Sequence, residues 1–187
     1  MAGGVAVAWR FEHRGSVDLD VFIPGEFDAV LLARDLSNTG PGLEVTSVAD
    51  RTVYAVIDGI PASVIGYSPP PLRPVEVVPG LALGLASLED LVTMKLAAIG
   101  GRGAAKDFWD LDVMLRGGVC GGELRGAMAA YGARFPGVDP GHVLRALTYF
   151  GDADAAPLPA GLTAEEWARI KERSSARVKA FFAAGKA

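Results

Sequence analysis

The sequence predicts an α+β protein, with its strands in the first part of the chain and its helices in the second. Three observations predict this class. Apolar and acidic residues alternate from Val17 to Phe22, as in a strand with one buried face. The dipeptide Asp58-Gly59 separates two β-prone runs, as in a tight hairpin. From Ser87 onward, apolar residues recur at helical spacing.

The composition is that of a folded, reduced protein. The chain has 187 residues, of which 50% are hydrophobic and 21% charged, enough for one domain with a sizeable core. A net charge of -4 argues against bulk electrostatic binding of nucleic acid, although a local basic cleft stays open. Cys120 is the single cysteine, which excludes an internal disulfide. The sequence shows no signal peptide and no apolar run of membrane-spanning length, so we expect a cytoplasmic protein.

A double glycine, Gly3-Gly4, stands near the start of the chain, ahead of the apolar segment 5–11. Two glycines let the backbone turn sharply and present N–H groups to a phosphate. A frayed terminus would leave the same pattern, so both interpretations stay open.

The strand expected over residues 17–22 carries two acids. Asp18 and Asp20 share one face, while Val17 and the other apolar residues face a core. Neighbouring carboxylates repel, which raises the pKa of at least one unless a cation lies between them. Such a pair can hold Mg²⁺ against a triphosphate. The alternative is a solvated strand whose outer face is acidic.

The next elements end in a proline-rich segment. We expect a short helix and three strands, over residues 27–36, 43–49, 52–57 and 60–67. Asp58 is more typical of a turn former than of a catalytic acid. The prolines between residues 69 and 79 exclude a helix there, so we expect an extended loop that crosses the sheet.

The clearest helix begins at Ser87, which can cap it. Its apolar residues form one stripe: Leu88, Leu91, Val92 and Ile99. Lys95 falls in the middle of that stripe. A lysine in that place either extends its amine to solvent or meets an anion.

A second helix is expected from Ala104 to about Arg116. Asp107 and Asp110, three residues apart, share one side of it. Lys106 could neutralise Asp110 locally, which is the purely structural alternative to a site.

Weaker helices are expected beyond the linker 117–122, over residues 123–131 and 142–150. A last helix begins at Thr163, with a capping box to Glu166. The pair Phe181-Phe182 indicates a packed or partner-binding end of that helix.

Four motifs stand in order: Gly3-Gly4-x-Ala6, His13-Arg14-x-Ser16-x-Asp18-x-Asp20, Ala86-Ser87-Leu88-Glu89-Asp90-Leu91-x-x-x-Lys95-Leu96 and Arg102-Gly103-x-x-Lys106-Asp107-x-x-Asp110-Leu111. In this order and spacing they resemble the AbiEii/AbiGii family of nucleotidyltransferase toxins, the toxin half of type IV toxin–antitoxin modules. The resemblance implies a DNA polymerase β-like nucleotidyltransferase core, a small mixed sheet flanked by helices, followed by a helical part. We expect the core over residues 1–100 and the helical region over residues 101–187.

The resemblance also implies an activity: Mg²⁺-dependent transfer of a nucleotide from a nucleoside triphosphate to RNA, with tRNA as one target, restrained by an antitoxin protein. By the same resemblance, Asp18 and Asp20 hold the metal, and Lys95 holds the triphosphate. Asp110 completes the catalytic set. The implied nucleotide-binding residues are Gly3, Gly4, Arg14, Ser16, Lys95, Lys106 and Asp107.

Two departures from the family pattern weaken these expectations. Almost no chain precedes Gly3, so we expect either a truncated start or a short first strand whose helix is missing. Relatives often carry a third acid followed by an aromatic residue before the proline-rich stretch. Here these positions read Ser63 and Tyr67, and Glu76 is a poorly spaced substitute. The alternative is therefore a weakened or silent relative that binds a nucleotide or a protein.

Enzyme classes that need other equipment fit poorly. The sequence has no Gly-x-x-x-x-Gly-Lys-Ser/Thr phosphate loop, and two distant histidines with one cysteine form neither a zinc site nor a catalytic triad.

Overall fold

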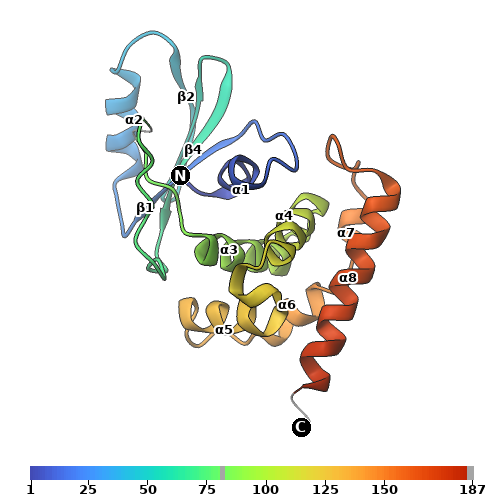
Figure 1. Cartoon of the computed structure of the whole chain (residues 1–187). Coiled ribbons are helices and arrows are strands. Elements are labelled where there is room, and N and C mark those ends of the chain that lie inside the picture. The colour runs from blue at the N-terminus through green and yellow to red at the C-terminus, as the bar shows by residue number, and fades with distance from the viewer. Residues whose placement is uncertain (81–82, 185–187) are drawn as a thin grey trace.

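The computed structural model describes residues 1–80 and 83–184, with the sheet at one end and most helices at the other (Figure 1). The elements in chain order are α1 (Gly3–Phe11), β1 (Leu19–Pro24), α2 (Ala29–Ser37), β2 (Leu43–Ala49), β3 (Thr52–Ile57), β4 (Ile60–Tyr67), α3 (Leu88–Gly101), α4 (Ala105–Arg116), the 3₁₀ turn η1 (Val119–Gly122), α5 (Leu124–Arg134), α6 (Gly141–Ala146), α7 (Gly151–Asp154) and α8 (Ala164–Ala183).

The sheet is mixed, with strand order β1-β4-β3-β2. β1 runs parallel to β4, while β4, β3 and β2 are successively antiparallel. Asp58 and Gly59 both have positive φ, at 49° and 82°, as a two-residue hairpin with a type I′ turn requires. The predicted hairpin turn and the three strands predicted over residues 43–49, 52–57 and 60–67 are confirmed.

β1 starts later than expected. It begins at Leu19, so Asp18 lies just before the strand, and Val17 is 72% exposed instead of buried. In the parallel register Leu19 is the partner of Ala62, so Asp18 would pair with Pro61. Proline has no N–H to give to the ladder, which ends the pairing there.

Helix α2 covers one face of the sheet. Asp28 caps it by accepting from the N–H groups of Val30 and Leu31, at 2.9 and 3.0 Å. Ala29 and Ala33 of this helix pack with Val53 in a small apolar cluster. The helix expected over 27–36 is confirmed, shifted by one or two residues at each end.

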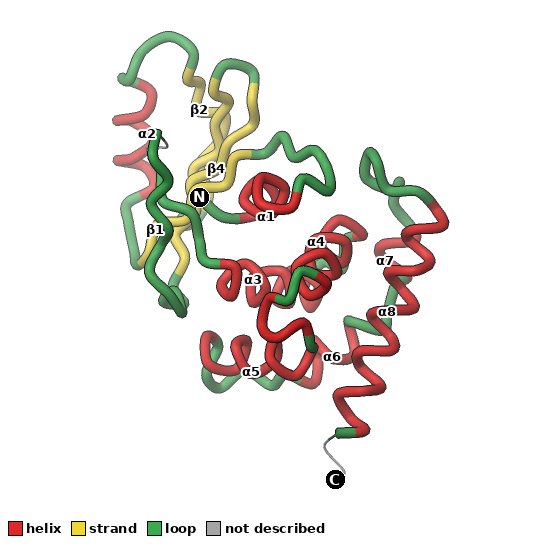
Figure 2. The backbone as a smooth tube through the Cα atoms, viewed as in Figure 1, coloured by secondary structure: helices red, strands yellow, loops and turns green. Residues whose placement is uncertain are grey.

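The other helices gather on the opposite side of the sheet (Figure 2). A continuous apolar core joins α1, α3, α4, α5 and α8, and its buried members include Val7, Leu91, Phe108, Met128 and Ile170. Ser87 caps α3 by accepting from the Asp90 N–H at 3.0 Å, as predicted.

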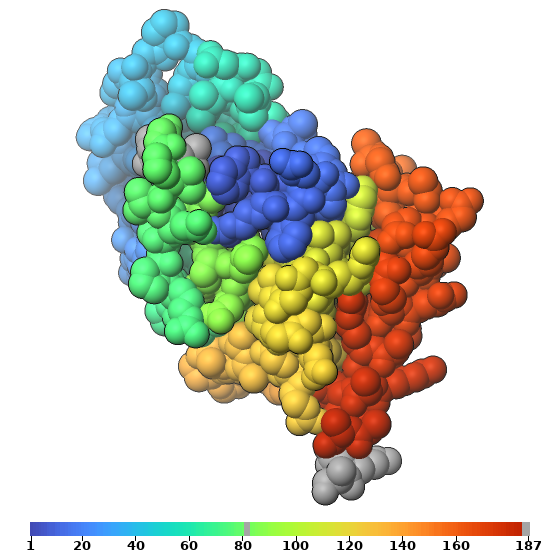
Figure 3. Space-filling view, in the orientation of Figure 1, coloured from blue at the N-terminus to red at the C-terminus, as the bar shows by residue number. Residues whose placement is uncertain are grey.

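The start of the chain is tied into this core. The Met1 amino group donates to the Gly84 carbonyl at 2.6 Å, and Ala2 makes a single bridge to Asp20. The short first strand is thus a single bridge, and α1 begins directly after it at Gly3. The two alternatives for the segment before the double glycine, a truncated start or a missing helix, stay predictions. In the space-filling view α1, in blue, lies between the green loop after β4 and the yellow helices (Figure 3).

In its described residues, 68–80 and 83–87, the loop after β4 contains no helix, as the prolines predict. It is pinned by a bridge between Glu76 and Leu85.

The C-terminal helices differ in part from expectation. The helix predicted over 142–150 ends as α6 at Ala146. The N–H groups of Thr148 and Tyr149 bond three residues back, and the Thr148 hydroxyl donates to the Arg145 carbonyl at 3.0 Å, so the α-helical pattern stops there. The linker 117–122 contains the turn η1.

Only half of the predicted capping box forms at α8. The Thr163 hydroxyl accepts from the Glu166 N–H at 3.2 Å, but the Glu166 carboxylate pairs with Arg173. Phe181 packs against the core, whereas Phe182 is 54% exposed. No helix in the described part of the chain is long and apolar enough to cross a membrane.

Candidate active site

A cleft of about 940 Å³ opens between the sheet and helices α1, α3 and α4. This volume lies at the upper end of the range for ligand pockets. Most of the predicted site residues line it: Gly3, Gly4, Arg14, Ser16, Asp18, Asp20, Lys95 and Lys106. Asp107 and Asp110 lie behind this surface and are fully buried. The structure therefore brings the predicted residues together, although they come from segments some ninety residues apart.

The pairing of β1 with β4 brings Ser63 beside Asp20. The two residues are register partners, and the Ser63 hydroxyl donates to Asp20 Oδ1 at 2.6 Å. Asp18 is exposed and lines the same cleft. Ser63, at the position where relatives often carry a third acid, thus lies next to the acidic pair, and its hydroxyl points at the Asp20 carboxylate.

The double glycine packs directly onto this group. Gly3 has a φ of +73°, and a Cβ at this position would lie 2.5 Å from Asp20 Oδ2. A Cβ at Gly4 would lie 2.5 Å from Arg14 Nη2 and 3.0 Å from Ser16 Oγ. Only glycine allows the first turn of α1 to approach these side chains so closely. The frayed-terminus interpretation is therefore wrong.

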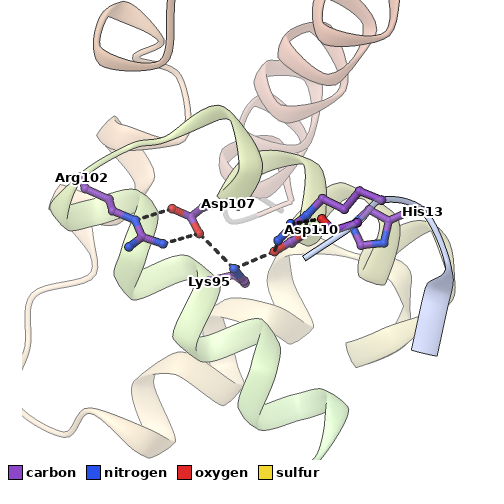
Figure 4. Close-up of polar contacts among 7 residues, drawn as sticks. His13, Lys95, Arg102, Asp107 and Asp110 are labelled. Atoms are coloured by element: carbon purple, nitrogen blue, oxygen red, sulfur yellow. Dashed lines mark hydrogen bonds and ion pairs between the residues drawn. The ribbon is translucent and has the colours of Figure 1, made fainter. Parts of the chain in front are cut away.

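Lys95 does not reach solvent. It is 5% exposed, and its Nζ lies 3.0 Å from Asp107 Oδ1 and 2.6 Å from Asp110 Oδ2 (Figure 4). Of the two interpretations of this lysine, the one in which it meets an anion is correct. The anions come from the next helix, whose side chains face α3 across the short break at residues 102–104.

Both aspartates also bind arginine. Arg14 makes a bidentate pair with Asp110, from Nε at 2.7 Å and Nη2 at 2.8 Å, and His13 Nε2 lies 2.8 Å from the same carboxylate. Arg102 binds Asp107 in the same forked way, at 2.8 and 2.9 Å. The result is a charge chain of alternating sign that runs Arg102–Asp107–Lys95–Asp110–Arg14, exposed at Arg102 and buried at the other four residues. Figure 4 shows its part from Arg102 to Asp110.

Lys106 does not pair with Asp110, which was the purely structural alternative to a site. Asp110 is neutralised by Arg14 and Lys95, not by Lys106. Among the described residues Lys106 makes no ion pair, and its side chain lines the cleft. Its ammonium group is therefore available to an anionic ligand.

The buried carboxylates are ionised. Burial by itself would raise the pKa of Asp110, but hydrogen bonds from Arg14 and His13 and the charge of Lys95 outweigh it and hold that pKa well below its usual range. The pKa of Asp107 is also lowered, because the bond from Arg102 and the charge of Lys95 outweigh the effect of burial. Neither group takes up a proton near neutral pH.

The acidic pair fits Mg²⁺ only together with a ligand. Oδ1 of Asp20 accepts a hydrogen bond from the Ser63 hydroxyl. The ligands left for a cation are therefore Oδ2 of Asp20 and the Asp18 carboxylate. In residues 1–80 and 83–184 no three His, Cys, Asp or Glu side chains are grouped to hold a metal alone. Glu76 pairs with Arg10 and lies outside the cleft. Mg²⁺ commonly uses one or two carboxylates plus phosphate oxygens and water, which suits these residues.

Sequence reasoning missed two members of the site. Arg102 and His13 both stand inside the motifs of the sequence, yet nothing in their spacing indicates that they bind Asp107 and Asp110. The signal available for Arg102 is its place in a glycine-rich break between two helices, close to the acids of the second.

Comparisons with known proteins show what the whole chain is similar to. The sequence model of the family described as nucleotidyl transferase AbiEii toxin, type IV TA system, matches residues 54–184. A protein of Aquifex aeolicus without an assigned function is 30% identical over 155 residues, which cover 82% of this chain and 74% of that protein. A crystal structure of a Helicobacter pylori protein assigned as a nucleotidyltransferase superposes with a TM-score of 0.53 at 18% identity, covering 95% of this chain and 85% of that one. This likeness extends the agreement in fold to the N-terminal part, which carries Asp18 and Asp20.

Proposed function

Because this chain belongs to the AbiEii family of nucleotidyl transferase toxins from type IV toxin–antitoxin systems, we propose that it transfers a nucleotide from a nucleoside triphosphate to a hydroxyl of an RNA acceptor, with Mg²⁺, and releases pyrophosphate. The observation that carries this proposal is the cleft itself. It has an acidic wall, with Asp18 and Asp20, and a cationic helical wall. A metal–triphosphate complex needs both signs of charge in one site.

The charges of the helical wall support a role in holding the triphosphate. Its cations are Arg14, Lys95, Arg102 and Lys106, and its acids are Asp107 and Asp110, so its formal charge is 4 − 2 = +2. Arg102 is the outermost of the paired cations, because 59% of its side chain is exposed. The first turn of α1 adds backbone N–H groups and the positive end of the helix dipole. Together these groups would neutralise much of the phosphate charge.

Asp18 and Asp20 would hold Mg²⁺ on the opposite wall, where the ion would neutralise phosphate charge and orient the reacting oxygens when bound. Ser63 orients Asp20 through its hydrogen bond. It contributes no negative charge, which favours a slow enzyme over a fast one.

Asp110 acts as a positioning residue in this proposal. Arg14, His13 and Lys95 direct four donor contacts at its two oxygens, so no lone pair is left to accept a proton from a substrate hydroxyl. Its carboxylate instead fixes the amine of Lys95 and the guanidinium of Arg14 beside the cleft. Asp107 does the same for Arg102 and Lys95.

A cognate antitoxin protein and a cytoplasmic location belong to the same proposal. Both follow from the family and from the proposed substrates, since nucleoside triphosphates and RNA are found together in the cytoplasm.

The test is incubation of the protein with each labelled triphosphate, Mg²⁺ and total tRNA. We expect label in RNA for at least one triphosphate, and none from the double variant Asp18→Asn/Asp20→Asn. Asp35→Asn is the matched control, because Asp35 is an exposed acid on α2 outside the cleft. A double variant that transfers as well as the natural protein would reject the metal role of the pair.

The alternative function is that of a silent relative that only binds a nucleotide. The serine at position 63, where relatives often have an acid, favours it. Thermal stabilisation by Mg²⁺ and triphosphate without any transfer to RNA would support this alternative, because a ligand that binds only the native state raises its stability.

A further inference from the structure

One aromatic ring in the cleft, that of Tyr54, belongs to no aromatic or cation–π pair among the described residues. Tyr54 lies on β3 and is the register partner of Ser63, which is itself the partner of Asp20. The three side chains therefore form a row across neighbouring strands on one face of the sheet. With strands about 4.8 Å apart, the backbone of Tyr54 is roughly 10 Å from that of Asp20.

The Tyr54 ring is free in the described chain. It is 45% exposed and lines the cleft, and it packs against no other aromatic ring among residues 1–80 and 83–184. Tyr67, the other tyrosine of the cleft, is different. Its ring packs edge-on against Phe22 at 5.3 Å and lies under the Arg134 guanidinium at 5.1 Å, so it already has partners within the chain.

The wall around Tyr54 does not suit a phosphate. The cleft-lining residues from β3 and β4 are all uncharged: Tyr54, Pro61, Ala62, Ser63, Ile65 and Tyr67. The cations lie on α3, α4 and the segment after α1. If the triphosphate is held by those cations, the second substrate has to reach the acidic pair from the side of β3 and β4.

We propose that Tyr54 is a stacking platform for the unpaired terminal base of the acceptor strand. This inference rests on the proposed transferase function, which already names RNA as the acceptor, and assigns a residue that would bind the end of that RNA. A flat, half-exposed ring beside a charged centre can bind any base by its face, and such stacking needs no sequence-specific hydrogen bonds.

The experiment measures binding without catalysis. A fluorescein-labelled hairpin RNA with a single-stranded 3′ end is titrated with protein in the absence of triphosphate. It is compared with the same RNA whose last nucleotide is abasic. Removing one stacking aromatic should weaken binding of the intact RNA about 5- to 150-fold, the equivalent of about 1–3 kcal/mol. The abasic RNA should bind the natural protein and the variant equally.

Three variants separate stacking from folding. Tyr54→Val puts another residue of high strand propensity on β3 but removes the ring, whereas Tyr54→Phe keeps the ring and should bind like the natural protein. Tyr149→Ala is the matched control, since Tyr149 is 60% exposed and lies outside the cleft. Thermal melts of all three show whether each variant is folded at the assay temperature.

Several results would overturn the inference. The first is that the protein binds no RNA. The second is that Tyr54→Val weakens binding of the intact and the abasic RNA equally, or that folded Tyr54→Val binds the intact RNA as well as the natural protein. The third is that Tyr54→Val lowers the affinity for Mg²⁺–triphosphate and leaves the affinity for RNA unchanged. Failure of the proposed function looks different: no nucleotide would be transferred to RNA, while RNA binding could still depend on Tyr54 and the terminal base.

Discussion

Lys95→Met is the substitution that best tests the buried charge chain. Methionine has nearly the same length as lysine and suits the apolar stripe of α3, so packing changes little. The change removes the cation that lies 3.0 Å from Asp107 and 2.6 Å from Asp110. Two buried carboxylates are then left without the charge between them.

The expected loss of stability is smaller than for a fully orphaned pair. Breaking a buried ion pair costs about 3–5 kcal/mol, and each lost charge-assisted hydrogen bond about 1.5–3 kcal/mol. Arg102 still neutralises Asp107 and Arg14 still neutralises Asp110, so we expect about 3–4 kcal/mol. For a chain of this size that loss lowers the melting temperature on the order of 10 °C.

Urea unfolding of both proteins at pH 7 and at pH 4 measures this effect. The pKa values of Asp107 and Asp110 are lowered in the folded protein, so their stabilising contribution is full above the unfolded value, near 3.8, and is lost as the pH falls through the folded values. Without Lys95 both pKa values are lowered less. The difference between the two proteins should therefore be largest at pH 7 and should begin to shrink toward pH 4.

Two further variants decide whether the charge chain is the cause. Lys106→Met changes a lysine without an ion pair in the described chain and should alter stability by less than about 0.5 kcal/mol. Adding Asp107→Asn to Lys95→Met removes one of the two carboxylates and should restore part of the loss, a coupling that a double-mutant cycle measures. Equal stability of Lys95→Met and the natural protein, or no coupling in the cycle, would refute the reasoning.

Three more predictions concern other parts of the structure. Gly3→Ala should destabilise the protein by about 1–2 kcal/mol and abolish its thermal stabilisation by Mg²⁺–triphosphate, because the new Cβ would lie 2.5 Å from Asp20 Oδ2 at a φ of +73°. Gly15→Ala is the control, since a Cβ there would have nothing within 4 Å, and it should show neither effect in a thermal melt. Asp112→Asn should cost about 2–4 kcal/mol in urea unfolding, because this buried acid binds Arg173 and Arg177 and so fastens α8 to α4, while the exposed Glu172→Gln should cost almost nothing. Ser63→Asp should lower stability without metal and raise the affinity for Mg²⁺ measured by calorimetry. The Ser63 hydroxyl lies 2.6 Å from Asp20, so the new carboxylate would lie next to the Asp20 carboxylate and repel it unless a cation binds both. An unchanged affinity for Mg²⁺ would contradict this prediction.

Local chemistry predicts much of this fold. The Asp58-Gly59 turn, the Ser87 cap and the stripe of Leu91, Val92 and Ile99 depend only on near neighbours in the sequence, and all are confirmed. The errors occur where a distant partner decides. β1 begins only at Leu19, because Asp18 would have to pair with Pro61 on β4. No pattern in the sequence around Asp18 indicates that partner.

The site shows the same division. The motifs bring together the right segments, and the anomalous Lys95 indicates a buried anion. The sequence does not indicate that Arg14 and Asp110, 96 residues apart, form a bidentate pair. Such a pair depends on how α1 packs against α4, which is a property of the whole core.

The charge chain also explains why a buried lysine would suit the proposed triphosphate site. A charged group in the core is stable only when opposite charges lie beside it. Two carboxylates with forked arginine partners flank Lys95 and hold its amine in one place before any ligand arrives. The charge chain contains three basic side chains and two carboxylates, so its formal charge is 3 − 2 = +1. A ligand therefore meets a fixed, positive surface that need not reorganise, which is the form of electrostatic stabilisation that phosphoryl chemistry uses most.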